Sequence, residues 1–283
     1  GTDISSLYLD DGYLFFRVDP VEVLVEGDSI DVELRVYEGP QATINKIIVE
    51  GNSKTSDHVI LRELRTIPGN KFSRAELIRS QRELINLGFF NQENMQVVPL
   101  PDPNKGTVDI KYVVEEKPSD QLMFQGGWGG TVRDNTGRVI GGGFIGTVGV
   151  SFNNFAAKKF FQPKAWKPVP SGHGQKLTLN IQLNGRGFQN YAISFMEPWL
   201  GGKKPNSLGI SVNYSINQAI TTNYRLAILG TSVDFGRRLK FPDDYFRSYT
   251  SFNYNYFDVR NGYFIFRIND GFINKFSIRQ TFD

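Results

Sequence analysis

The sequence predicts an α+β soluble part followed by the antiparallel strands of a transmembrane β-barrel. Residues 1–117 are rich in Glu, Asp, Val and Ile, whereas residues 121–283 are rich in Gly, Asn, Ser, Phe and Tyr and carry few acids. In the second region apolar residues recur at every other position within segments of about ten residues, the length of a tilted strand that crosses a bilayer. The change of character near Pro118 predicts a domain boundary.

Composition excludes several classes of protein. A formal net charge of +3 on 283 residues leaves no nucleic-acid footprint, so no nucleic-acid partner is expected. Without cysteine the chain holds neither disulfides nor thiolate metal sites, which is compatible with an oxidising compartment. No run of eighteen apolar residues predicts a transmembrane helix, but alternation in a membrane barrel keeps the mean hydropathy low, and here it is -0.31.

Residues 42–117 predict a βααββ unit. Ser56 is expected to cap the first helix and Pro68-Gly69 to end it. Ser73 and Glu76 form a capping box at the start of the second helix, which Gly88 ends. The predicted elements are a strand at 44–49, a helix at 57–65, a helix between Ser73 and Gly88, and strands at 95–98 and 107–114.

Residues 1–40 repeat the second half of this unit. A helix remnant at Ile4–Leu9 is followed by predicted strands at Tyr13–Val18 and Ile30–Tyr37. The run "LYLDDGYLFFRV…IDVELRVYEGP" echoes "LINLGFF…VDIKYVVEEKP" in order and spacing. No signal peptide is visible at Gly1, and because the chain opens within a module, we expect its native N-terminus to have been removed.

Eight alternating segments follow Asp120. The positions that alternate with the apolar residues are filled mostly by small or amide residues, which suit a polar lumen. Aromatic residues gather near the segment ends. A soluble β-sandwich also alternates and is the alternative reading. The eight segments are 122–130, 144–153, 177–184, 189–196, 208–217, 227–239, 246–257 and 273–282.

Several motifs resemble the family of the outer-membrane assembly factor BamA. The βααββ unit ending in "VEEKPSD" resembles its periplasmic POTRA module, and "QGGWGG" resembles its first barrel strand. "YAISFMEPWLGGKKPNSLGISVNYS" resembles a barrel stretch in which Glu197, Pro198 and Trp199 end a strand before a turn. Proline cannot donate to a ladder, and tryptophan suits a membrane rim. The implied domains are half a POTRA module at 1–40, a complete one at 41–118, and the N-terminal half of the barrel at 119–283.

This resemblance implies a function and a place. The protein would fold and insert client barrels into the bacterial outer membrane, with its N-terminal modules in the periplasm. Its partners would be unfolded outer-membrane proteins, accessory lipoproteins of the assembly complex and outer-membrane lipids. A two-partner-type secretion pore is the alternative, and a structural or solute-diffusion barrel is a third reading. The attached periplasmic module argues against the third.

The barrel of the resembled family has about sixteen strands, of which this chain would supply about eight. Eight strands can also close by themselves. "IRQTFD" resembles mid-barrel sequence, so we expect a fragment. The family also carries an Arg-Gly-aromatic motif in a later loop. Arg186-Gly187-Phe188 imitates it in a different hairpin, where a glycine turn is the preferred reading.

No catalytic motif or cofactor site emerges, so we expect no enzyme. Gly141, Gly143 and Gly146 satisfy G-x-G-x-x-G, but they lie in a turn entering a strand rather than between a strand and a helix. His58 and His173 have no neighbouring metal-ligand pattern.

The first barrel strand is the candidate lateral gate. In lipid every backbone group must be paired, so a weak seam in a barrel is functional. Glycine raises the entropic cost of ordering a strand and offers no side chain to pack across the seam. The alternative is that these glycines only permit twist and close packing. The candidate gate residues are Leu122, Phe124, Gly126, Gly127, Trp128, Gly129 and Gly130.

The soluble modules are expected to bind extended segments by β-augmentation. In the resembled fold the exposed edge is the strand formed here by Met95, Gln96, Val97 and Val98. Pro99 and Pro101 would cap this strand and limit indiscriminate pairing.

Three connections, 154–174, 200–206 and 236–244, are expected on the periplasmic side. They form a candidate basic rim that would bind anionic lipids or an acidic accessory subunit. The alternative interpretation is that these residues are ordinary solvated lysines in turns. The connection at 154–174 is longer than the family usually has, and its Pro-aromatic clusters predict an ordered flap. The basic residues are Lys158, Lys159, Lys164, Lys167, Lys203, Lys204, Arg237, Arg238 and Lys240.

Overall fold

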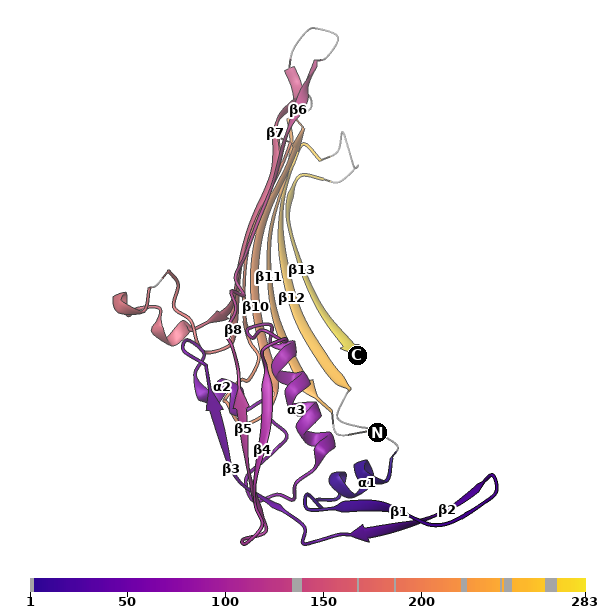
Figure 1. Cartoon of the computed structure of the whole chain (residues 1–283). Coiled ribbons are helices and arrows are strands. Elements are labelled where there is room, and N and C mark those ends of the chain that lie inside the picture. Colours follow the sequence, from indigo (N-terminus) through magenta and orange to yellow (C-terminus); the bar gives the residue numbers. More distant parts are fainter. Residues whose placement is uncertain are drawn as a thin grey trace. The chain divides into compact units, whose positions relative to one another are not determined.

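A computed structural model describes most of the chain (Figure 1). The chain divides into two compact units, Gly1–Pro118 and Ser119–Asp283, each of which is considered separately. No helix in the part of the chain that the structure describes is long and apolar enough to cross a membrane. The described residues are 3–133, 139–166, 168–185, 187–219, 223–239, 241, 246–262 and 269–283.

The larger part of unit 1 is the expected βααββ module. The central strand of its sheet is β5, which pairs in parallel with β3 and antiparallel with β4, giving the order β3-β5-β4. Both β3 and β4 are therefore edges of this sheet. The module consists of β3 (Thr43–Glu50), α2 (Asp57–Leu61), α3 (Arg74–Asn86), β4 (Gln96–Asp102) and β5 (Thr107–Val113).

The helix ends follow local chemistry in one case and depart from it in the other. Ser73 Oγ accepts a hydrogen bond from the N–H of Glu76 at 3.4 Å, and Gly88 follows α3 with a φ of +75°. The prediction that the first helix runs to residue 65 was wrong. From Leu61 onward its bonds shorten to three-residue spacing, as in the 3.3 Å bond from Leu64 N–H to the carbonyl of Leu61. Ser56 makes no side-chain cap.

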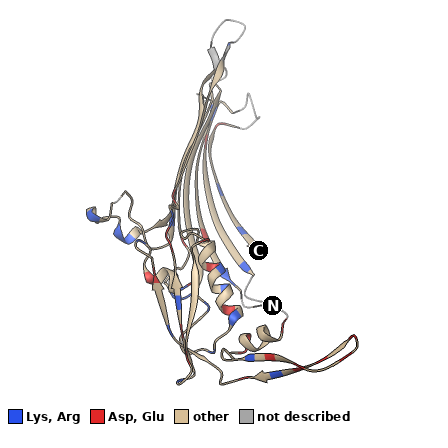
Figure 2. Ribbon diagram, in the orientation of Figure 1, with Lys and Arg blue, Asp and Glu red and all other residues tan. Residues whose placement is uncertain are grey.

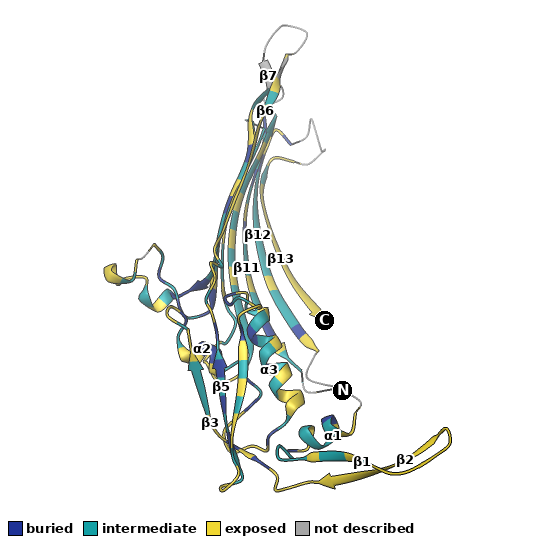
Figure 3. Cartoon of the chain, viewed as in Figure 1, coloured by how far each residue is buried: buried dark blue, intermediate teal, exposed yellow. Residues whose placement is uncertain are grey.

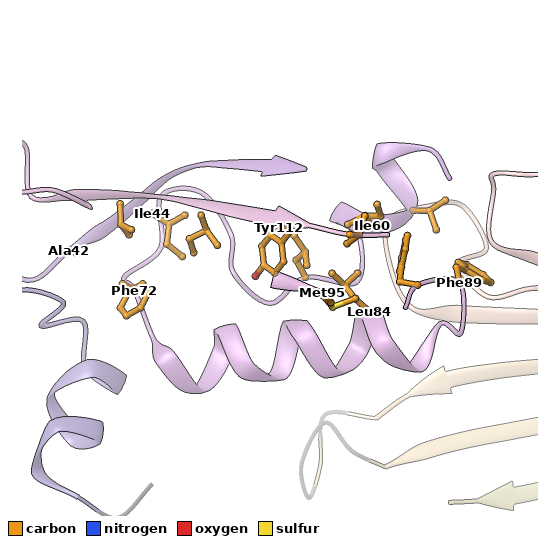
Figure 4. Close-up of a cluster of buried hydrophobic side chains, with 14 residues drawn as sticks. Ala42, Ile44, Ile60, Phe72, Leu84, Phe89, Met95 and Tyr112 are labelled. Atoms are coloured by element: carbon orange, nitrogen blue, oxygen red, sulfur yellow. The ribbon is translucent and has the colours of Figure 1, made fainter. Parts of the chain in front are cut away.

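One hydrophobic core holds the module together (Figure 4). Leu84 of α3 and Val108, Ile110 and Tyr112 of β5 are fully buried between the helices and the sheet. The buried hydroxyl of Tyr112 lies 2.8 Å from the hydroxyl of Thr66, so its polar atom is satisfied. Burial raises the pKa of Tyr112, partly offset by its hydroxyl partners.

The first forty residues form α1 (Ile4–Asp10), β1 (Arg17–Glu26) and β2 (Ser29–Tyr37). The strand predicted at 13–18 is present but was placed too early, because turns precede it: Leu14 N–H bonds the carbonyl of Gly12, and Phe16 N–H bonds that of Tyr13. Phe16 instead stacks on Tyr8 of α1, with ring centroids 4.1 Å apart. The strand therefore begins at Arg17 and extends to Glu26, where a tight turn returns it into β2.

Unit 2 is one antiparallel sheet in which each strand pairs with its neighbours in sequence. All eight predicted strands are confirmed. In the described residues β6 and β13 are the first and last strands of this sheet. Its strands are β6 (Gln121–Arg133), β7 (Val139–Phe155), β8 (Gln175–Asn184), β9 (Phe188–Glu197), β10 (Asn206–Ala219), β11 (Tyr224–Arg238), β12 (Arg247–Arg260) and β13 (Gly271–Phe282).

Candidate functional site

The register of the sheet in unit 2 separates its two faces. Because side chains alternate along a strand, residues paired across the sheet share a face. One row crosses all eight strands and is polar at every position. Ser151 and Thr178 of this row lie 3.2 Å apart through their hydroxyls, and Ser211 and Ser232 lie 2.9 Å apart. The row is Gln121, Ser151, Thr178, Ser194, Ser211, Ser232, Asn253 and Ser277.

The opposite face is apolar. The row one residue along is Leu122, Val150, Leu179, Ile193, Val212, Thr231, Tyr254 and Phe276, with Thr231 as its one polar member. The neighbouring row from β7 to β13 is Phe152, Leu177, Phe195, Ile210, Val233, Phe252 and Ile278.

Many of these apolar side chains are exposed, as the yellow and teal strands of Figure 3 show. Ile193 is 47% exposed and Ile210 is 45% exposed. In the part of unit 2 that the structure describes, no protein layer covers this apolar face, as is typical of a strand surface that faces lipid. A soluble sandwich would place a second sheet there, whereas the described strands of unit 2 form a single sheet.

The candidate gate strand β6 is the first strand of this sheet and pairs with β7. Gly126 faces Gly146, and a Cβ added to either would meet the ring of Phe144, at 3.2 Å and 2.5 Å. The Phe144 ring therefore covers this glycine pair. By contrast, a Cβ at Gly127 or Gly130 would meet nothing within 4 Å.

Leu122, Phe124 and Trp128 alternate with the glycines of β6 on the apolar face and are more than 70% exposed. The ladder to β7 is regular up to Gly129 and shifts register beyond it. The G-x-G-x-x-G glycines lie within β7 and not in a loop between a strand and a helix.

The strand-end turn is held by its own glutamate. Glu197 Oε1 accepts a hydrogen bond from the N–H of Trp199 at 2.9 Å, and Pro198 between them ends β9. The other carboxylate oxygen of Glu197 accepts a 2.7 Å bond from Gln175 Nε2. Nothing in the sequence indicated that Gln175 is part of this site. It reaches Glu197 only through the pairing of β8 with β9, which places it on the same face as Leu177.

The basic residues lie at one end of the sheet. The connections from β7 to β8, from β9 to β10 and from β11 to β12 share the end at which β6 begins, because the strands run antiparallel. Lys158 and Lys159 lie in the short helix η1 (Ala157–Lys159), and Lys203 and Lys204 in the β9–β10 turn. Arg237 and Arg238 end β11. Lys167 and Lys240 of the rim, and Arg186 of the hairpin motif, lie outside the described residues.

The edge strand of the POTRA-like module differs from the prediction at both ends. Met95 lies before β4, and its side chain is buried in the core. Pro99 and Pro101 lie inside β4 rather than capping it. Proline is tolerated in a ladder only where its missing N–H would face away from the partner strand. The two prolines therefore remove donors from the free edge and leave Val97 as a donor on that side.

Glu116 fastens the end of the module. Its carboxylate accepts hydrogen bonds from Ser53 Oγ at 2.7 Å and from the N–H groups of Lys54 and Thr55 at 2.8 Å and 2.6 Å. Burial alone would raise its pKa, but these hydrogen bonds outweigh burial and hold the pKa of Glu116 below its usual range.

Comparison with known proteins finds relatives over much of the chain. It is 30% identical over 174 residues to an outer membrane protein assembly factor BamA from Nitratidesulfovibrio vulgaris, which covers 57% of this chain and 21% of that protein. It is 33% identical over 193 residues to the BamA of Neisseria meningitidis serogroup B, covering 68% of this chain and 20% of that protein. The chain thus spans about a fifth of the length of these relatives.

Among solved structures, the crystal structure of BamA from Haemophilus ducreyi lacking POTRA domains 1–3 matches 99% of this chain and 51% of that chain. The TM-score is 0.66 at 22% identity, which shows a shared fold. Two family models also match: POTRA, described as a surface antigen variable number repeat, over residues 42–117, and the Omp85 superfamily domain over 171–281.

The two-faced sheet and the module before it define an outer-membrane β-barrel protein with periplasmic POTRA modules. Within that class, the chain carries a POTRA domain and an Omp85 superfamily domain, and BamA proteins are among its homologues. It covers POTRA sequence and part of the barrel, and it is located in the outer membrane with its N-terminal modules in the periplasm.

Proposed function

We propose that this chain is the gate-bearing part of a non-enzymatic machine that folds client β-barrels and inserts them into the outer membrane. The observation that supports the proposal best is the glycine content of β6, the first strand of the sheet, in which Gly127 and Gly130 have open space around them. When the seam of a barrel opens at such a strand, the strand edge that it frees is a template for another strand. In lipid that template attracts a client hairpin strongly, because unpaired backbone groups cost several kcal/mol each.

Release requires that the new pairing be weak enough to break. Gly127 and Gly130 contribute no side chain to a seam and have open space around them. Ordering such a strand costs roughly 0.5–1 kcal/mol more per glycine than ordering alanine. Beyond Gly129 the ladder to β7 is also irregular, so this end of β6 is its least firmly held part. We infer that a client pairs with β6, grows and leaves sideways into the bilayer.

The gate is tested by replacing Gly127 and Gly130 with threonine in the full-length protein, reconstituted in vesicles with an unfolded client. Threonine favours strands, and both sites have room for it, unlike Gly126 under the Phe144 ring. We expect client insertion to slow several-fold. Ser215→Thr on the internal strand β10 is the matched control and should leave the rate unchanged. An unchanged rate in the glycine variants would contradict a gate at β6.

We propose that the POTRA module receives clients by β-augmentation at β4. Its free edge keeps few donors because of Pro99 and Pro101, so pairing there is short and reversible. The second edge, β3, carries no proline and is the rival site. A photocrosslinker at Gln96 should capture client more than one at Lys46 on β3 or at Arg82 on α3. Capture at Arg82 alone would argue against augmentation.

The basic rim would hold the periplasmic end of the sheet against outer-membrane lipids, and accessory lipoproteins would complete the machine. If the reconstituted protein exported one soluble client and inserted none, the two-partner-type secretion pore would replace the assembly function. Insertion assays with a barrel client and an exported client, run side by side, separate these outcomes.

A further inference from the structure

The connection between β7 and β8, residues 156–174, is here called the flap. It contains η1 and η2 (Pro163–Ala165), and Figure 1 shows it standing out from the ends of β7 and β8. Its base is closed by backbone bonds, from Ala156 N–H to the carbonyl of Pro170 at 3.0 Å and from Gly172 N–H to that of Asn154 at 2.8 Å. The side chain of Asn154 also accepts the N–H of Gly174 at 2.8 Å. These bonds hold the two ends of the flap together at the ends of β7 and β8.

The base of the flap lies on the apolar side of the sheet. Gln175 shares its face with Leu177 and Leu179, because it lies two residues before Leu177. Its side-chain oxygen accepts the N–H of Ala157 at 2.6 Å, while its amide binds Glu197. The chain thus enters the flap over the face that requires lipid, at the end where β6 begins.

The flap carries its aromatic side chains outward. Phe160 lies at the centre of the group, with ring centroids 5.3 Å from those of both Phe161 and Trp166. Trp166 Nε1 donates to the carbonyl of Phe160 at 2.9 Å, which fixes the indole. Phe161 is nevertheless 90% exposed, and Phe160 and Trp166 are 42% and 46% exposed. Aromatic side chains that are fixed in place and still exposed to this extent indicate a contact surface for a partner outside unit 2.

The charge of the flap selects the partner. In the sequence Lys158, Lys159 and Lys164 lie beside or between the aromatic residues of the flap, and there is no acid between Asp134 and Glu197. Figure 2 shows blue segments and no red ones on the flap. Lys159 Nζ is partly used within the flap, at 3.1 Å from the carbonyl of Ser171. Aromatic rings with lysines at the end of a membrane-spanning face match the headgroup region, where amphipathic rings and cations are favoured.

We propose that the flap is a membrane foot, which inserts Phe161 and Trp166 among the headgroups of the periplasmic leaflet and binds anionic lipid through Lys158 and Lys164. This inference rests on the membrane-crossing sheet but not on the gate. The foot would fix the depth and tilt of the barrel edge that contains β7 and β8, next to the strand where clients are proposed to enter.

The test uses the full-length protein in vesicles of phosphatidylethanolamine with phosphatidylglycerol, without client. This sequence contains no cysteine, and any cysteine elsewhere in the full-length protein is first replaced. Single spin labels are then placed at Gln162→Cys in the flap, at Ile193→Cys on the apolar face and at Lys105→Cys in the POTRA module. Collisions with oxygen and with a water-soluble nickel complex report depth. We expect the collision rates to place the Ile193 label in the lipid tails, the Lys105 label in water and the Gln162 label at the membrane interface.

If the Gln162 label were as accessible to the nickel complex as the Lys105 label while the Ile193 label lay in lipid, the membrane foot would be overturned. The proposed gate would be unaffected. Protection of the Gln162 label from both reagents would also overturn the foot, since that result indicates a protein partner. Water-like readings at Ile193 would instead refute the membrane-crossing sheet.

Charge is tested in the same vesicles with Lys158→Glu and Lys164→Glu combined. We expect the Gln162 label to move toward water, with a smaller difference between vesicles with and without phosphatidylglycerol. The matched control, Lys105→Glu with Lys117→Glu, makes the same charge change in exposed residues of the POTRA module and should leave the label in place. An equal movement in both double variants would contradict a specific foot.

Discussion

The two units use the same apolar residue types in opposite ways. In unit 1 the large apolar side chains of α3 and β5, such as Leu84 and Ile110, are fully buried against one another. In unit 2 side chains of the same kind, such as Ile193 and Val212, lie in rows on an uncovered face. The difference shows that each unit is matched to its solvent. Water favours burial of the apolar side chains of unit 1, whereas those of unit 2 are stable on the surface only in lipid.

The largest expected effect comes from truncating the buried core. Phe90 is fully buried in unit 1, so Phe90→Ala should lower the free energy of unfolding of this unit by about 3–5 kcal/mol. Leu179→Ala, on the lipid-facing row of unit 2, should cost less, because lipid refills the space. Denaturant-dependent amide exchange of the full chain in vesicles measures both, and equal costs would erase the contrast between the units.

A charge on each face of the sheet is the next test. Ile193→Lys places an ammonium on the apolar face and should cost about 2–4 kcal/mol near the bilayer midplane. Ser194→Lys, one residue along on the polar row, should cost much less. Urea titration of folding into vesicles gives both values. If the order were reversed, the faces would be assigned the wrong way round.

A smaller effect is expected at the start of α3. Ser73→Ala removes the acceptor of the Glu76 N–H and should destabilise unit 1 by about 1 kcal/mol. Ser56→Ala is the natural comparison, since the Ser56 side chain makes no capping bond, and it should cost a few tenths of that. Amide exchange in the first turns of α3 and α2 reads the two changes separately.

The smallest effect concerns pH. The lowered pKa of Glu116 means that its contribution to stability is present above the unfolded pKa and is lost as pH falls through the lower folded value. Exchange protection at Lys54 and Thr55, whose N–H groups bind this carboxylate, should therefore fall in acid. In Glu116→Gln that pH dependence should be flattened, and a protection that falls equally in the variant would exclude Glu116 as its origin.

Local chemistry determined much of this protein from sequence alone. The alternation of Leu177–Leu183 and of Leu208–Ile216 predicted strands and their two faces, because a period of two is a property of the extended backbone itself. Ser73 and Gly88 marked α3 for a similar reason, since caps and positive φ depend on the nearest residues. The Glu197-Pro198-Trp199 motif located the end of β9 in the same way.

Only the tertiary structure decided which residues far apart in the sequence contact one another. Met95 became core rather than edge, and residues 13–16 left the strand pattern, because burial against α3 and α1 outweighed their propensity. The link from Ala157 through Gln175 to Glu197 spans 18 and then 22 residues, and no local pattern encodes it. Only the register of β8 against β9 brings these groups together, and with them the side of the sheet on which the flap begins.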